Sequence, residues 1–135
     1  MNPAHVNFPG ALVGAFLAFL VGGIWYSPVL FAKPWMRATG LQDDELKKGT
    51  GRVFGGAFAL ALVGNVNLAF FLADGTPNLG WGIAAGALAG VGWVATAMGV
   101  TYLFERRSLR LYLIDAGYHV VALMLSGAIL GVWKR

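Results

Sequence analysis

Four long apolar runs determine what this chain can fold into. They lie at about 8–26, 53–72, 79–103 and 109–133 and cover most of the 135 residues. Each run has about 19 to 25 residues, and about 20 are needed to cross the hydrocarbon of a bilayer as an α-helix. The runs do not alternate as the strands of a membrane β-barrel would, and helices satisfy their own backbone polar groups, as lipid demands. We therefore expect an all-α integral membrane bundle of four transmembrane helices.

The composition agrees with a bilayer environment. Hydrophobic residues make up 58% of the chain and charged residues 12%, whereas soluble domains are about 25% charged. The length suits one domain over residues 1–135. The net charge of +4 does not indicate nucleic-acid binding, because the basic residues lie in short segments between apolar runs, where they contact lipid headgroups. The lipid bilayer is therefore the expected partner.

The connection between the first two spans is the longest. Residues 29–40 mix apolar and basic side chains, which predicts a short amphipathic segment at the membrane interface. Residues 42–48 predict one exposed helix with its acids first and its lysines last, ended by Gly49. Elsewhere, Asn7, Asn78 and Ser108 are expected to cap the first, third and fourth spans, and residues 74–78 to form a tight turn.

The distribution of lysine and arginine predicts the orientation. Eight of the ten lie in the first and third connections, and the other two are Lys134 and Arg135. The positive-inside rule therefore puts both connections in the cytoplasm and both termini on the extracytoplasmic side of a bacterial inner membrane.

Small residues recur every four positions, a pattern that lets helix backbones approach closely in lipid. These stripes have two interpretations. They either pack against other helices inside the bundle or form the contact of a homo-oligomer, and the third span is the main candidate for such a contact. The glycines that form these stripes are Gly10, Gly14, Gly22, Gly82, Gly86, Gly90, Gly127 and Gly131.

Two ionisable side chains lie inside a span, where they are costly and usually face the protein interior. Asp115 and His119 are four residues apart in the fourth run, so they share a face and are expected to form one coupled unit. The same polar seam continues to Tyr112 and Ser126. Helix rise predicts that Asn65 lies near the depth of His119, and that the Trp93 indole lies near Asp115. We therefore expect Asn65 to bond His119 and Trp93 to bond Asp115.

This seam has two interpretations. It is either a hydrogen-bonded cluster that fixes helix register, or part of a proton, ion or substrate path through a transport or conduction unit. A metal site is disfavoured because only two ligands are available at depth, and no cofactor is expected. No catalytic motif occurs, so we do not expect an enzyme. The alternative function is an accessory or structural subunit, or an assembly factor, of a larger membrane complex.

Two segments resemble a known family. Residues 23–31 (GIWYSPVLF) followed by 33–36 (KPWM) resemble its N-terminal signature. Residues 105–111 (ERRSLRL), 115–119 (DAGYH) and 127–131 (GAILG) resemble its C-terminal one. The family is domain of unknown function 1761, small multi-pass proteins mostly of bacteria. The resemblance implies a membrane location and about four spans, and it carries no activity, substrate or cofactor.

Overall fold

The computed structural model describes residues 3–74 and 78–133. The described residues form helices joined by short connections, and no strand occurs among them. In chain order the elements are η1 (Pro3–His5), α1 (Phe8–Trp25), α2 (Ala32–Thr39), α3 (Asp43–Leu46), α4 (Thr50–Phe71), α5 (Leu79–Ala89), η2 (Gly90–Ala95), α6 (Thr96–Phe104) and α7 (Leu109–Val132). The all-α fold expected from the apolar runs is confirmed.

Four helices of the described chain are long and apolar enough to cross a membrane. They are α1, α4, the continuous helix Leu79–Phe104 that comprises α5, η2 and α6, and α7. The expected caps are present, because the side chains of Asn7, Asn78 and Ser108 accept hydrogen bonds from backbone amides of the following helices. The turn expected at 74–78 falls partly on residues 75–77, which lie outside the described residues.

The first connection differs in detail from the expectation. The interfacial segment contains α2, which ends at Gly40 in the left-handed conformation. The helix expected over 42–48 is shorter, since α3 spans only Asp43–Leu46. Gly49 then takes a φ of 63°, and α4 begins at Thr50, ahead of the apolar run. The left-handed conformation of Gly49 changes the direction of the backbone, so α3 cannot continue through Lys47 and Lys48 into α4.

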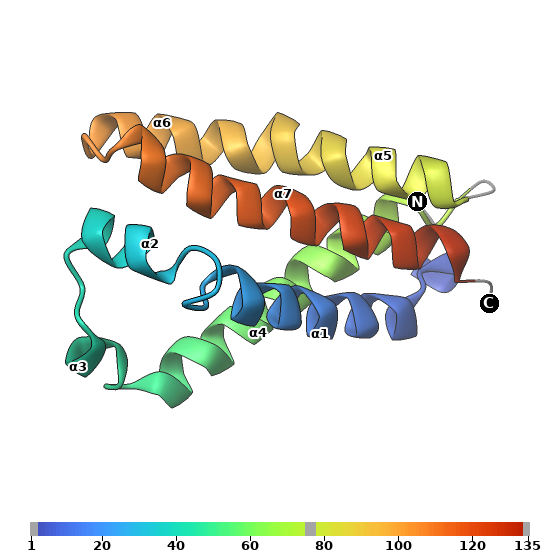
Figure 1. The fold of residues 1–135 in the computed structure, drawn as a ribbon. Coiled ribbons are helices and arrows are strands. Elements are labelled where there is room, and N and C mark those ends of the chain that lie inside the picture. Colours follow the sequence, from blue (N-terminus) through green and yellow to red (C-terminus); the bar gives the residue numbers. More distant parts are fainter. Residues whose placement is uncertain (1–2, 75–77, 134–135) are drawn as a thin grey trace.

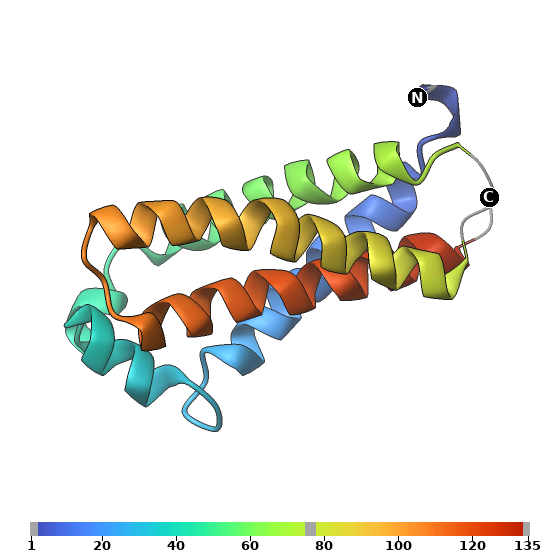
Figure 2. The same ribbon diagram turned by 90° about the horizontal axis from the view of Figure 1, so that it is seen from above.

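The four long helices run back and forth between two ends of the molecule (Figure 1). One end carries α2, α3 and the turn between α6 and α7, and is called the basic end. The other carries the first and last described residues and the connection from α4 to α5, and is called the terminal end. In Figure 1, α7 lies between α1 and the α5–α6 helix, and the view at right angles in Figure 2 shows that α4 lies apart from α7 over much of its length.

Glycines bring α5 and α7 into backbone contact. A Cβ on Gly82 would overlap the carbonyl oxygen of Gly127, and a Cβ on Gly127 would overlap that of Gly82. Gly86 lies equally close to the backbone of Leu123. Such approach permits Cα–H···O contacts across the crossing. The small-residue stripe of the third span therefore faces α7 within the same chain rather than a free surface.

A π-helical stretch interrupts the third span at η2. Such a stretch inserts one residue and leaves carbonyl groups without their usual amide partners. The Thr96 hydroxyl donates to the carbonyls of Gly92 and Trp93 at 2.7 and 3.0 Å. The Tyr112 hydroxyl, from α7, donates to the carbonyl of Ala95 at 2.7 Å. These hydroxyl groups compensate for the altered helical bonding within the span.

Candidate functional site

Asp115 is held by two tyrosines from other parts of the chain. The Tyr26 hydroxyl, at the end of α1, donates to one carboxylate oxygen at 2.8 Å. The Tyr102 hydroxyl, from α6, donates to the other at 2.6 Å. We call these three residues the tyrosine clasp. Asp115 lies six residues into α7, which places it roughly 9 Å from the basic end of that helix.

The surroundings of the clasp are aromatic and reach the surface of the basic end. Trp25 donates its indole N–H to the carbonyl of Ile114 at 2.9 Å, which fixes the end of α1 against α7. The guanidinium of Arg107 lies 5.5 Å from the centre of the Tyr102 ring. A hydrogen bond to Glu105 raises the pKa of Arg107, so this cation keeps its charge above the ring.

The expected bond between Trp93 and Asp115 is absent, and this prediction was wrong. Trp93 has 64% of its surface exposed. Its ring lies 5.6 Å from that of Phe71 on α4. Helix rise gives the depth of a residue but not the direction in which its side chain points, and Trp93 lies within the π-helical stretch that changes the helix phase.

The expected bond between Asn65 and His119 is also absent. His119 is exposed, and its ring packs at a tilt of 60° against that of Tyr118, with centroids 4.9 Å apart. The prediction that Asp115 and His119 form one unit in the bundle interior was therefore wrong: no hydrogen bond joins them in the described chain, although the carboxylate acts on the imidazole electrostatically. Four residues turn a helix by about 400°, so the two side chains are offset by about 40°. That offset turns Asp115 toward the tyrosines and His119 toward the outer face.

Asn65 and Ser126 instead meet at Gly14. Asn65 has 3% of its surface exposed and Ser126 has 1%. The Asn65 amide nitrogen donates to the carbonyl of Ala61 at 2.8 Å. Its amide oxygen lies against Gly14, and a Cβ on that glycine would come within 3.2 Å of the Ser126 hydroxyl oxygen. Neither the Asn65 oxygen nor the Ser126 hydroxyl has a hydrogen-bond partner among the described residues.

Polar groups follow the small-residue stripe of α1 from end to end, and we call this line the α1 seam. The Asn7 side chain covers Gly10, and its amide nitrogen has no hydrogen-bond partner within residues 3–74 and 78–133. Asn65 and Ser126 come next, at Gly14. The Tyr118 hydroxyl then donates to the carbonyl of Ala18 at 2.9 Å. The seam ends at the tyrosine clasp.

The polar seam expected from the sequence includes Tyr112 but neither tyrosine of the clasp. In the structure, the hydroxyls of Tyr26, Tyr102 and Tyr112 bind a carboxylate or a carbonyl inside the bundle. Asp115 is the sequence signal that points to Tyr26 and Tyr102, because it lies within two turns of the same end of the bundle and a buried tyrosine hydroxyl needs an acceptor.

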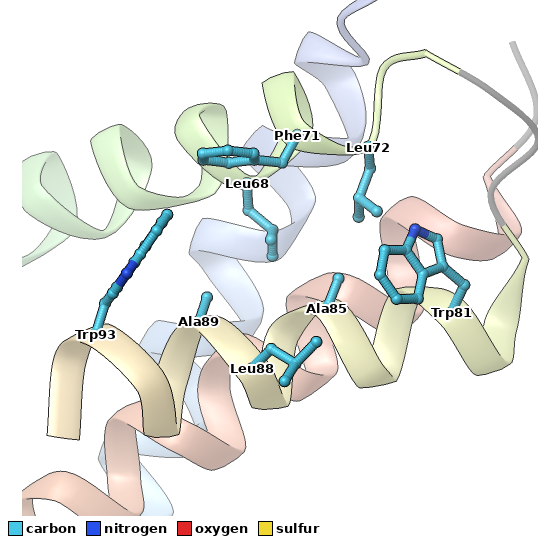
Figure 3. A pocket seen from close by; sticks show the side chains of 8 residues that line it. All are labelled: Leu68, Phe71, Leu72, Trp81, Ala85, Leu88, Ala89 and Trp93. Carbon is cyan, nitrogen blue, oxygen red and sulfur yellow. The ribbon is translucent and has the colours of Figure 1, made fainter. Parts of the chain in front are cut away.

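A groove separates α4 from α5 (Figure 3). Its volume is about 350 Å³. Its walls are apolar, and Trp81 and Trp93 lie along its α5–η2 side. None of the Asp115, His119, Asn65 and Ser126 side chains lines it. The lining residues are Leu68, Phe71, Leu72, Trp81, Ala85, Leu88, Ala89 and Trp93.

At the terminal end, an imidazole and a carboxylate join η1 to the segment after α4. His5 Nδ1 lies 3.1 Å from a carboxylate oxygen of Asp74. The hydrogen bond from His5 is the main cause that lowers the pKa of Asp74. His5 therefore ties the N-terminal segment to the residues that follow α4.

Comparison with known proteins identifies a family and no activity. No protein of curated function and no solved structure matches the chain. A family model, described as "Protein of unknown function (DUF1761)", matches residues 10–131, which include nearly all of each span, the α1 seam except Asn7, and the tyrosine clasp. The chain therefore belongs to the DUF1761 family.

Proposed function

We propose that this protein is a small, non-enzymatic transport or conduction unit that moves a small cation, with Asp115 as its cation-handling group. One observation supports this proposal most. Asp115 is the only acidic residue of the sequence inside a span, and it is held by neutral hydroxyl groups. A carboxylate kept only for structure is usually paired with a cation, because an uncompensated charge is costly in a membrane.

The chemistry of the clasp suits reversible binding. Two phenol donors stabilise the carboxylate without neutralising it, so its charge remains available to a proton or a small cation. The titratable groups that act on Asp115 are Tyr26 and Tyr102 by hydrogen bonding, and Arg107 and His119 through space. A cation that binds Asp115 would replace the phenol hydrogens as its partner.

The orientation that we propose gives the clasp access to the cytoplasm. Eight of the ten lysines and arginines lie in the two connections of the basic end. By the positive-inside rule that end faces the cytoplasm of a bacterial inner membrane, and both termini face the extracytoplasmic side. The tyrosine clasp then lies near the cytoplasmic mouth of the α1 seam, which continues toward the opposite side.

Flux measurements on the purified protein in liposomes test this proposal. A potassium gradient with valinomycin supplies the driving force, and internal dyes report protons or sodium. We expect the protein to raise the flux of at least one cation above that of empty liposomes. Asp115→Asn should reduce that flux at least tenfold, whereas the matched control Asp44→Asn, on exposed α3, should leave it unchanged. Wild-type liposomes no more permeable than empty ones would show that the proposal is wrong.

A second candidate function is a subunit of a membrane complex, in particular a homo-oligomer. The groove between α4 and α5 favours it, because α4 and the α5–α6 helix are the least covered spans of the chain. We propose a helix of a second copy as the occupant. A single cysteine at Leu88, an exposed residue of the groove wall, should then give a cross-linked dimer in native membranes. A cross-link to a larger protein would favour an accessory subunit instead, and monomer alone would contradict both.

A further inference from the structure

Asn65 and Ser126 face the same short layer of the bundle interior. Gly14 lies six residues after the start of α1, while Asn65 and Ser126 lie six residues before the ends of α4 and α7. All three therefore lie roughly 9 Å inside the terminal end. The Asn65 oxygen and the Ser126 hydroxyl both approach Gly14. Both atoms are buried, and neither has a hydrogen-bond partner in the part of the chain that the structure describes.

Small residues make the next layer toward the basic end. Each of the three residues has an alanine one helical turn away, on the same face of its helix. These alanines are Ala18 on α1, Ala61 on α4 and Ala122 on α7. The Tyr118 hydroxyl lies at the carbonyl of Ala18 and still has an oxygen lone pair to offer. Along α1, the alanine layer therefore lies between the level of Gly14, where Asn65 and Ser126 approach, and the Tyr118 hydroxyl.

We propose that this alanine layer holds an ordered water bound by Asn65 and Ser126. The contact of the Asn65 oxygen with Gly14 resembles a Cα–H···O interaction, which is about half as strong as an N–H···O bond. This weak contact leaves a lone pair of the Asn65 oxygen without a donor, and the Ser126 hydroxyl proton without an acceptor, among the described residues. One water donates to the first and accepts from the second, and buried waters are usually found where such groups converge.

A metal ion does not fit the same layer. Hard cations take about six or more oxygen ligands and prefer carboxylates. Asn65 and Ser126 offer neutral oxygens, and no group of three or more His, Asp or Glu side chains that could hold a metal occurs among the described residues. Water, or its protonated form, is the ligand that these donors and acceptors match.

The role of this water rests on the proposed function and makes protons the cation that the protein moves. The Tyr118 ring lies 5.6 Å from that of Tyr26 in the tyrosine clasp. The water and the Tyr118 hydroxyl would therefore extend the line from Asp115 toward Asn7. In each step the water oxygen gains one proton from one neighbour and loses another to the next, so that a neutral water remains.

Water-edited solid-state NMR on the labelled protein in lipid bilayers tests the binding site directly. We expect magnetisation to pass from water to the Asn65 side-chain carbonyl about as fast as to exposed Asp44. It should reach buried Leu68, one turn further along α4, several-fold more slowly. Ser126→Ala should slow the transfer to Asn65. Thr96→Val, which removes a hydroxyl from another span, should not change it. Equal, slow transfer to Asn65 and Leu68 in the wild type would overturn the site.

Flux measurements then separate the site from its role. Ser126→Ala, and Ala122→Leu, which fills the layer without removing a polar group, should each lower proton flux at least tenfold. Sodium should not pass in the wild type. If the wild type shows no flux at all, the proposed function fails while the NMR result still decides the water site. The proton-relay role is wrong if both variants lose the water but keep wild-type proton flux. It is also wrong if sodium passes through the wild type.

Discussion

The Tyr26 hydroxyl donates a 2.8 Å hydrogen bond to Asp115, across 89 residues of sequence. It joins the end of the first span to the beginning of the last. Tyr102 binds the other carboxylate oxygen, so the charge connects three segments of the basic end. This end has fewer buried apolar contacts than the terminal end, where the main apolar core lies between α1, α4 and α7. The clasp is therefore well placed to hold α1, α6 and α7 together.

Removing one phenol of the clasp should destabilise the bundle. Tyr26→Phe and Tyr102→Phe should each lower the free energy of unfolding by about 1.5–3 kcal/mol, because each removes a hydrogen bond to a charged group. Tyr118→Phe is the matched control. It removes a bond to a neutral carbonyl, and such interhelical bonds in membranes average about 0.6 kcal/mol. Unfolding by denaturant in micelles measures all three, and equal losses would contradict a charged clasp.

The crossing of α5 and α7 should not tolerate a methyl group. A Cβ on Gly86 would lie 2.6 Å from the carbonyl carbon of Leu123 and 2.8 Å from the Cα of Met124. Since these are backbone atoms, Gly86→Ala must push the helices apart, at a cost of about 1–3 kcal/mol. Gly64→Ala in α4 is the control, because nothing lies within 4 Å of its Cβ position. Thermal unfolding in the same detergent should show a loss for Gly86→Ala alone.

The π-helical stretch should depend on Tyr112. Tyr112→Phe removes the donor to the Ala95 carbonyl and should cost about 0.5–1.5 kcal/mol. Hydrogen exchange provides a local measurement. We expect faster amide exchange across Gly90–Ala95 and unchanged exchange in α5, which has regular helical bonding. Unchanged protection of η2 in the variant would show that Tyr112 does not support the stretch.

Acid should open the pair at the terminal end. The hydrogen bond from His5 lowers the pKa of Asp74. A lowered carboxyl pKa means that the pair stabilises the fold at pH values above the ordinary Asp pKa of about 3.9. That contribution is lost as the pH falls through the lowered value in the folded protein. A carboxyl carbon titration by NMR should give a midpoint below the ordinary value in the wild type and a higher midpoint in His5→Ala. Identical midpoints would refute the link.

The proposed orientation can be tested cleanly because the chain has no cysteine. Glu45→Cys lies on α3 at the basic end, and Trp133→Cys lies at the terminal end; both positions are exposed. An impermeant maleimide added to intact spheroplasts should label Trp133→Cys and should reach Glu45→Cys only after lysis. The reverse pattern would mean that the basic end faces outward.

The spans and the helix starts can be predicted from the sequence because they depend on residues close together in the chain. The length of each apolar run set the four spans, because a helix must cover the thickness of the hydrocarbon. Asn7, Asn78 and Ser108 set where helices begin, since capping involves only residues three positions apart. Asp115 was recognised as a special residue because a charge inside a span must find a partner.

The partner of each polar group depends instead on how the helices pack against one another. Periodicity gives the depth of a side chain and its angle on its own helix, but the rotation of one helix relative to another depends on packing between them. Asn65 contacts Gly14 on α1 and does not bond to His119. Trp93, in the π-helical stretch, packs against Phe71 and does not bond to Asp115. Tyr26 and Tyr102 reach Asp115 because α1 and α6 end beside the start of α7 at the basic end, where both hydroxyls bind its carboxylate. Those contacts join residues far apart in sequence, so no local pattern encodes them.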